Sequence, residues 1–458
     1  MELLLRVPVE LWERIFGFVC ISLSRDRHSL EIKIRPTTKF SYGYSVITIT
    51  PIILTHVCSR WRRIATRCPR LWSSIAVHLR EGYLKGGTNL VETFLERSMP
   101  RLLDLDIVLE KSMWQSESAT ATWEVLKYHF SRSERLFLDA EKNIDPDPLI
   151  SFEELDIPFN NLVYFRIHRR WGFPPGGGRG ELETHKPLWR ALCRAPRLTR
   201  VNIDWVYPLA LFPWRQLTVV TIQDIFGRDF EELLKVLEVS ENLHTLKLGI
   251  ILADGLNTRR VKIPSLRTFS IFRNTDLDNS VTNAFFASFV MPSLSSFEFW
   301  CSWPPATELD WPASLLDMLQ ESSATLRIIS LFINSEEEPI EWPSLSLLLS
   351  TTPHLTEFHL TDVGEHEGTD LGSIFWNKLV IPFLSDFRNT SDKVILPELT
   401  HLILTDLEAT SDRIELIASV AACRRTCRIA GLGRDFSPLQ EFDVVERDES
   451  VRTEELFE

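Results

Sequence analysis

A hydrophobic motif, Leu-x-x-h-x-h with h an apolar residue, recurs along most of this 458-residue chain and constrains its fold more than any other feature. Between Leu198 and Leu355 successive copies begin 19 to 32 residues apart. A period in this range indicates a repeat array in which each unit stacks on its neighbours. The copies begin at Leu102, Leu162, Leu198, Leu217, Leu243, Leu266, Leu294, Leu326, Leu355 and Leu399, with a partial copy at 135–138.

Segments with helical spacing alternate with these strand motifs. Residues 188–195, 230–237 and 315–319 each precede a motif, and a proline such as Pro196 often separates helix from strand. Proline ends a helix and favours an extended conformation in the residue before it. We therefore predict an α/β solenoid of alternating helices and parallel strands over residues 81–440, with amphipathic strands in an ordinary α/β domain as the alternative.

The motif also predicts which side chains leave the core. The first Leu and the apolar residues at +3 and +5 point inward, so the residues at +2 and +4 lie on the exposed face of the sheet. That face is mixed and polar, as expected for a surface that binds a protein. Its candidate target-binding residues are Arg200, Asn202, Thr245, Lys247, Glu298, Glu357 and His359.

The first 80 residues lack the repeat and have helical patterns instead. Pro8 with Leu11 and Ile15 at helical spacing predicts a helix that begins near residue 8. A very regular apolar face predicts a single helix over residues 54–65. Residues 20–50 have no clean period and are interpreted as a variable insertion.

These N-terminal segments resemble an F-box of the kind found in fungal proteins. Residues 7–11 read Val-Pro-Val-Glu-Leu, residues 56–65 read His-Val-Cys-Ser-Arg-Trp-Arg-Arg-Ile-Ala, and residues 69–72 read Pro-Arg-Leu-Trp. Val7 stands where Leu is usual, and the long insertion leaves the middle of three helices unplaced. The resemblance implies a small all-α, three-helix module over residues 1–80 that docks on a Skp-type adaptor and through it on a cullin.

The same resemblance implies which residues face the adaptor or form the core of the module. They are Pro8, Glu10, Leu11, Ile15, Phe16, Leu54, Val57, Cys58, Trp61, Ile64, Leu71 and Trp72. The repeats loosely resemble leucine-rich repeats, but of the Asn ladder typical of that family only Asn274 and Asn334 are present. The backbone groups that such Asn residues bind must therefore find other partners.

Charge is distributed unevenly in a chain whose formal net charge is −13. Residues 1–80 contain 13 Lys/Arg and 5 Asp/Glu, whereas residues 441–458 contain 2 and 8. The acidity of the whole disfavours a nucleic-acid partner. The cluster Arg60, Arg62, Arg63 and Arg67 could steer association with the acidic adaptor surface that the resemblance implies. The segment 441–458 is predicted to be a disordered acidic tail.

Motifs for catalysis, cofactors and metals are nearly absent. The Gly-rich segment 174–180 lacks the Lys-Ser/Thr of a phosphate cradle, and Cys423 and Cys427 lack a second pair at zinc spacing. The uncharged stretches 40–59 and 279–297 contain Ser, Thr and a proline, unlike a membrane span. We expect no enzymatic activity, no cofactor, no metal and no membrane partner, and a location in the cytoplasm, the nucleus or both.

These inferences predict a substrate receptor of a cullin-based, SCF-type ubiquitin ligase. Its F-box would bind the adaptor, and its solenoid would capture a target protein, unidentified from the sequence, for ubiquitin-dependent degradation. One alternative is a non-catalytic interaction scaffold that acts outside a ligase. A second is a hydrolase with an unrecognised site, which predicts a deep polar pocket with perturbed acids.

Overall fold

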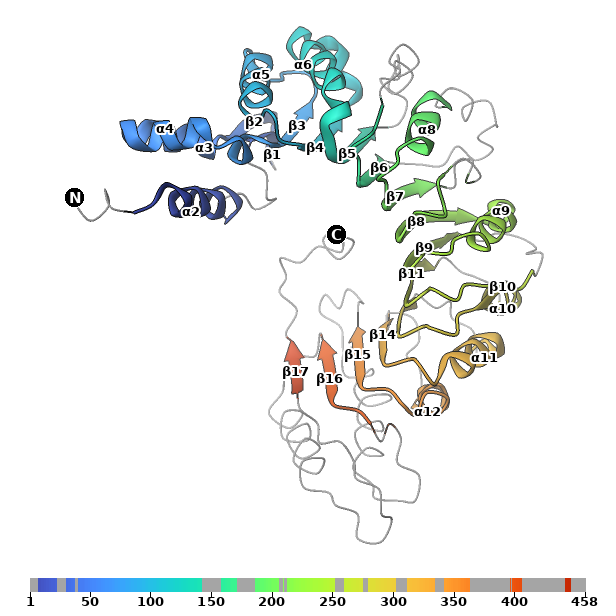
Figure 1. Ribbon diagram of the computed structural model, residues 1–458. Coiled ribbons are helices and arrows are strands. Elements are labelled where there is room, and N and C mark those ends of the chain that lie inside the picture. Colours follow the sequence, from blue (N-terminus) through green and yellow to red (C-terminus); the bar gives the residue numbers. More distant parts are fainter. Residues whose placement is uncertain are drawn as a thin grey trace. The chain divides into compact units, whose positions relative to one another are not determined.

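The computed structural model divides into two compact units, Met1–Leu217 and Thr218–Glu458. Both are drawn in Figure 1. The structure describes residues 7–22, 30–37, 40–141, 158–170, 186–205, 209, 212–251, 259–274, 279–301, 311–333, 342–362, 396, 398–405 and 441–445.

The first unit begins with three helices, α2 (Val9–Ser22), α3 (Thr50–Val57) and α4 (Ser59–Arg67), followed by a 3₁₀ turn, η1 (Pro69–Trp72). Helix α2 contacts α3, α4 and η1. The prediction of a single helix over residues 54–65 is wrong. Cys58 is extended, with φ −159° and ψ 168°, and its Sγ accepts a hydrogen bond from the backbone N–H of Trp61. This cap starts a new helix at Ser59.

The segment interpreted as a variable insertion contains a β-hairpin. Its strands are β1 (Leu30–Thr37) and β2 (Phe40–Thr48), which pair antiparallel. Strand β1 also pairs in parallel with β3 (Ser74–Leu79). The sheet therefore begins within the first 80 residues, which the sequence assigned to an all-helical module.

From β3 onward, the strands of the first unit pair in parallel and in chain order. They are β4 (Leu103–Leu109), β5 (Ser133–Glu141), β6 (Tyr164–Arg170) and β7 (Arg200–Trp205). The helical segments between them are α5 (Gly87–Arg97), η2 (Lys111–Gln115), α6 (Glu117–Tyr128), η3 (Phe130–Arg132) and α8 (Lys186–Cys193).

The second unit repeats this architecture. Its parallel strands are β8 (Val219–Phe226), β9 (Thr245–Ile251), β11 (Thr268–Asn274), β13 (Ser296–Cys301), β14 (Ile328–Ile333), β15 (Glu357–Asp362), β16 (His401–Thr405) and β17 (Glu441–Val445). Its helices are α9 (Gly227–Leu237), α10 (Asn279–Ala287), α11 (Ala313–Ser322) and α12 (Trp342–Ser350). Two short strands, β10 (Val261–Lys262) and β12 (Phe289–Val290), pair separately.

The leucine register explains where the strands begin. Nine of the ten motifs have a strand that starts two residues after the leading Leu, and the leading Leu of each of those nine is buried. The exception is Leu102, because the buried position is taken by its neighbour Leu103. The alternation of helices with parallel strands confirms the predicted solenoid-like α/β fold.

Hydroxyl side chains form some of the hydrogen bonds to the backbone that the missing Asn ladder would otherwise provide. Thr199, Ser295, Thr356 and Thr400 each directly follow a leading Leu, and each hydroxyl donates to a backbone carbonyl of the preceding repeat at 3.0 to 3.5 Å. In all four bonds the acceptor is the carbonyl of the residue that follows the leading Leu of that repeat, as in Thr400 Oγ1 to Thr356 O. The bonds tie consecutive turns together just before the strands begin.

The predicted acidic tail does not begin at residue 441. Residues 441–445 form β17, in which Phe442 and Val444 pair with Leu402 and Leu404 of β16. The alternation of apolar residues at 442 and 444 accounts for this strand. The rest of the tail, 446–458, lies outside the described residues, as do the Gly-rich segment 174–180 and Cys423 and Cys427. Among the helices that the structure describes, none is long and apolar enough to cross a membrane.

Candidate functional site

Three aromatic side chains form the centre of the N-terminal helical module. The Trp61 ring lies 5.2 Å from the Trp12 ring and 4.9 Å from the Phe16 ring, measured between centroids. Trp12 and Phe16 are buried, whereas Trp61 is half-buried. These contacts join α2 to α4 and leave one edge of Trp61 at the surface.

Beside this core, α2 and α3 each carry a stripe of exposed apolar side chains. The stripe on α2 consists of Leu11, Ile15 and Phe18, and the stripe on α3 consists of Ile53 and Val57; we call them together the apolar stripes. Their exposed fractions range from 46% for Ile15 to 72% for Phe18. Spacings of three and four residues place the members of each stripe on one helix face. Exposed apolar side chains gathered in this way mark an interaction surface.

Apart from the half-buried Trp61, the residues assigned by the F-box resemblance divide into two groups. Pro8, Glu10, Leu11, Ile15, Val57 and Cys58 are exposed, and Phe16, Leu54, Ile64, Leu71 and Trp72 are buried. Trp72 donates a hydrogen bond from Nε1 to the Ala65 carbonyl at 2.8 Å, which fixes η1 against α4. Ile53 was missed because the predicted helix began at residue 54, although Pro51 in the first turn of α3 signals an earlier start.

The arginines of α4 have two different environments. Arg60 donates from Nη2 to the Val7 carbonyl, and Arg62 donates from Nε to the Thr55 carbonyl, each at 2.8 Å. These bonds hold α4 to the chain before α2 and to α3. Arg63 and Arg67 are exposed and have no ion-pair partner among the residues that the structure describes. The latter pair is free to act on an approaching partner through its charge.

The exposed sheet face of the second unit contains five of the predicted target-binding residues. Thr245, Lys247, Glu298, Glu357 and His359 are all half-buried, and the pairing of β9, β11, β13, β14 and β15 brings them onto one face. Much of this face is internally hydrogen-bonded. Glu298 accepts from Ser270 Oγ at 2.8 Å and from Trp300 Nε1 at 3.1 Å, and His359 Nε2 donates to Glu357 Oε1 at 2.6 Å.

An aromatic pair lies one step along the same face. The rings of Trp300 and Phe332 stack with centroids 4.1 Å apart and planes 10° from parallel. Trp300 sits at the end of β13 that carries Glu298, and its indole is held by the hydrogen bond to that carboxylate. The face therefore combines fixed polar groups with a flat apolar surface.

The remaining two predicted residues, Arg200 and Asn202, lie on β7 in the first unit. Arg200 is exposed as expected, but Asn202 is 4% exposed, so its predicted exposure is wrong. Asn202 pairs in register with Arg166 of β6, which is half-buried. The motif at Leu162 places Tyr164 and Arg166 at its +2 and +4 positions, a signal that would have identified both as members of this face.

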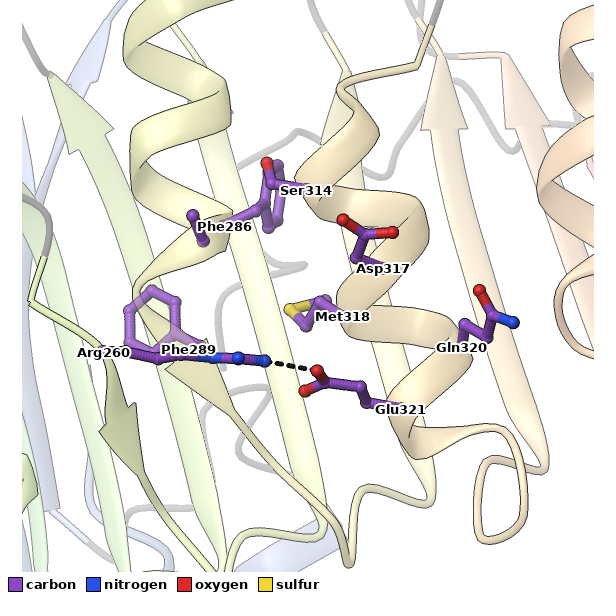
Figure 2. Close-up of a pocket in the computed structure, with 9 residues that line it drawn as sticks. Arg260, Phe286, Phe289, Ser314, Asp317, Met318, Gln320 and Glu321 are labelled. Carbon is purple, nitrogen blue, oxygen red and sulfur yellow. Dashed lines mark hydrogen bonds and ion pairs between the residues drawn. The ribbon is translucent and has the colours of Figure 1, made fainter.

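A groove lies between α10 and α11 and is drawn in Figure 2. It has a volume of about 660 Å³. An ion pair between Arg260 and Glu321 spans it, and Phe286 and Phe289 at its floor are buried. Ser314 Oγ donates to Asn283 Oδ1, and the described residues that line the groove include neither His nor Cys. Within the described lining, the Ser314 hydroxyl is thus bound to an amide and has no imidazole base beside it.

One carboxylate elsewhere has a perturbed acidity. His78 Nε2 donates to Glu110 Oε1 at 2.6 Å, and Arg80 lies 3.9 Å from the same oxygen. The hydrogen bond from His78 favours the charged form and holds the pKa of Glu110 below its usual value. The three residues lie at the ends of β3 and β4 and fasten these strands together. No cluster of three His, Cys, Asp or Glu side chains suited to a metal occurs among the described residues.

Comparisons with known proteins identify no family for this chain. No protein-family model matches it, and no curated protein matches it either.

Proposed function

We propose that this chain is the substrate-recognition subunit of an SCF-type ubiquitin ligase. Its N-terminal helical module would dock on a Skp-type adaptor, and its repeat region would bind a target protein for ubiquitination. The observation that best supports the proposal is the pair of apolar stripes on α2 and α3. They occur on the module whose sequence resembles an F-box.

The energetics of the stripes favour a protein partner. Full burial of an aliphatic or aromatic side chain stabilises by about 1.5–3 kcal/mol, so burying the exposed half of each contributes roughly 1 kcal/mol. For Leu11, Ile15, Phe18, Ile53 and Val57 together this amounts to about 5 kcal/mol before the entropic cost of association. A module of three short helices cannot cover these side chains itself, because its interior is already filled by Trp12 and Phe16.

The test is capture of the adaptor by the full-length chain. Leu11→Asp combined with Ile15→Asp places two charges in the proposed interface, and the recovery of a Skp-type adaptor in a pull-down should fall at least tenfold. The matched control is Val239→Asp with Leu347→Asp, which changes two similarly exposed apolar side chains in the second unit. Equal thermal melting of the variants excludes unfolding as the cause.

Co-purification of a cullin decides between the two functions. Recovery of both adaptor and cullin with the unaltered chain supports a ligase receptor. Recovery of the adaptor without a cullin supports the scaffold that acts outside a ligase. Recovery of neither refutes the F-box assignment, and unchanged adaptor capture by the Leu11/Ile15 variant refutes the assignment of the contact.

A further inference from the structure

Three neighbouring strands of the first unit bring arginines together on the exposed sheet face. In the register of β5, β6 and β7, Arg135 pairs with Tyr164 and Tyr164 pairs with Arg200. Two residues further along, Arg166 lies in the next row. Adjacent strands are about 4.8 Å apart and residues on one face recur about every 7 Å, so the three arginine Cα atoms lie within roughly 10 Å of one another.

Arg135 is held in place by its surroundings. Its guanidinium carbon lies 5.1 Å from the centroid of the Phe137 ring and 5.6 Å from that of the Tyr164 ring, and Nη1 is 3.4 Å from Asp104 Oδ2. The two rings meet edge to face with centroids 5.0 Å apart. Arg135 and its aromatic neighbours thus form a fixed edge of the surface.

Arg166 and Arg200 lack such partners. Within the described ranges, neither has an ion pair or a side-chain hydrogen bond, although Arg166 is half-buried. Next to Arg166 in register lies Asn202, which is 4% exposed and whose Oδ1 has no hydrogen-bond partner in the part of the chain that the structure describes. Leaving a buried acceptor unpaired costs about 1–3 kcal/mol, which a bound N–H donor would recover.

We propose that the arginine face, defined as Arg135, Arg166, Arg200 and Asn202, binds an extended segment of the target protein that carries Asp or Glu side chains. Arginine forms two-pronged hydrogen bonds with carboxylates, and Arg166 and Arg200 are available for them. Because Asn202 Oδ1 is buried in the unbound chain, it accepts a backbone N–H of the segment only once the side chains beside it, Arg166 among them, turn toward the bound carboxylates. This proposal rests on the proposed function only in calling the partner a target; binding of the segment does not require the adaptor.

The charge of the rest of the chain makes binding to this face more specific. With 63 Asp/Glu against 50 Lys/Arg, the net charge of the chain repels an acidic segment. Two arginines without an ion pair among the described residues therefore localise the segment on β6 and β7. Asp104 and Asp106 on β4 and Asp139 on β5 form the acidic border of the face and direct the segment toward β6 and β7.

The probe is a fluorescein-labelled 12-residue peptide of alternating Glu and Ser, with fluorescence anisotropy measured on the full-length chain. Binding should weaken as salt is raised, and Gln or Lys in place of Glu should abolish it. Arg166→Glu with Arg200→Glu should weaken binding at least tenfold while adaptor capture is unchanged. Arg190→Glu with Arg194→Glu, at two exposed arginines in and directly after α8, is the matched control and should have little effect.

Three results would overturn the proposal. The first is equal binding of the Glu peptide by the arginine variant and the wild type. The second is binding only of a peptide with phosphoserine in place of Ser and Gln in place of Glu, which would assign the face to phosphate. The third is a large rise in affinity when residues 446–458 are removed, which would make the acidic tail of this chain the occupant.

Asn202→Leu separates a recognition role from a structural one. Leu has a similar shape and removes the unpaired acceptor, so the melting temperature should stay the same or rise, while peptide affinity falls severalfold. A fall in melting temperature with unchanged peptide affinity would show that Asn202 serves the fold and would remove it from the arginine face.

Discussion

Replacing Gly249 with Ala tests a close approach between the backbones of β8 and β9. The register of β8 and β9 shifts between Ile222 and Ile225, so the chain of β8 bulges at this point. A Cβ on Gly249 would lie 1.7 Å from the carbonyl oxygen of Gln223 and 2.6 Å from its carbonyl carbon. It would also lie 3.0 Å from Cε2 of Phe272. Because the first two atoms belong to the backbone, no rotation of a side chain relieves the clash.

The cost follows from the displacement required. A carbon–oxygen contact needs about 3.3 Å, so β8 and β9 must separate locally by roughly 1.5 Å. Such a shift breaks about two hydrogen bonds of the ladder, at roughly 1 kcal/mol each, and disturbs the packing beneath by about 1–3 kcal/mol. We expect Gly249→Ala to lower the free energy of unfolding of the second unit by about 3–5 kcal/mol. Urea titration followed by circular dichroism and tryptophan fluorescence measures it.

Gly17→Ala is the matched control. Gly17 lies within α2, and a Cβ there would have no atom within 4 Å. Ala is favoured over Gly in a helix by about 1 kcal/mol, so this variant should be neutral or more stable. If the free energy of unfolding of Gly249→Ala lies within about 0.5 kcal/mol of the wild-type value, the close approach of β8 to β9 does not exist in solution.

Three further predictions concern the first unit. Trp61→Ala should destabilise the helical module by about 2 kcal/mol, less than for a fully buried Trp because one edge is exposed, and should show as earlier urea unfolding in circular dichroism. Arg63→Glu with Arg67→Glu should slow adaptor association and flatten its salt dependence in stopped-flow measurements, with little change in dissociation. The contact with His78 lowers the pKa of Glu110, so it stabilises the fold at pH values above the ordinary carboxyl pKa of 4.5. This stabilisation is lost as the pH falls through the lower pKa of the folded state. Melting temperatures between about pH 3 and pH 7 should therefore depend less on pH in Glu110→Gln.

The strands could be predicted from the sequence because their signal is local and repeated. Each leading Leu fixes the inward positions of the strand that follows, and one wrong choice between Leu102 and Leu103 shifted only a single repeat. The hairpin was missed although Leu30, Ile32 and Ile34 alternate with charged residues, a period-two pattern typical of a strand. The apolar period through residues 54–65 concealed the break at Cys58, because a cysteine seldom caps a helix.

The candidate surfaces depend on information that no single segment contains. Arg135, Arg166 and Arg200 come from three strands, and their neighbourhood follows only from the pairing of β5, β6 and β7. Asn202 occupies the +4 position of its motif, where an exposed side chain is expected. It is buried because neighbouring parts of the fold cover it. Likewise, helical spacing placed Leu11 and Ile15 on one face but left open whether that face lies inside or outside the module.

The β1–β2 hairpin determines how this protein can be divided experimentally. The hairpin lies between α2 and α3 in the chain, yet β1 pairs with β3, and β3 pairs with β4. A fragment that ends at residue 80 leaves one edge of β3 unpaired, and a fragment that begins at residue 81 leaves the matching edge of β4 open, which invites aggregation. The helices and the repeats therefore cannot be exchanged between proteins as independent cassettes at this point, and chimeras cut there would lose the fold of both parts.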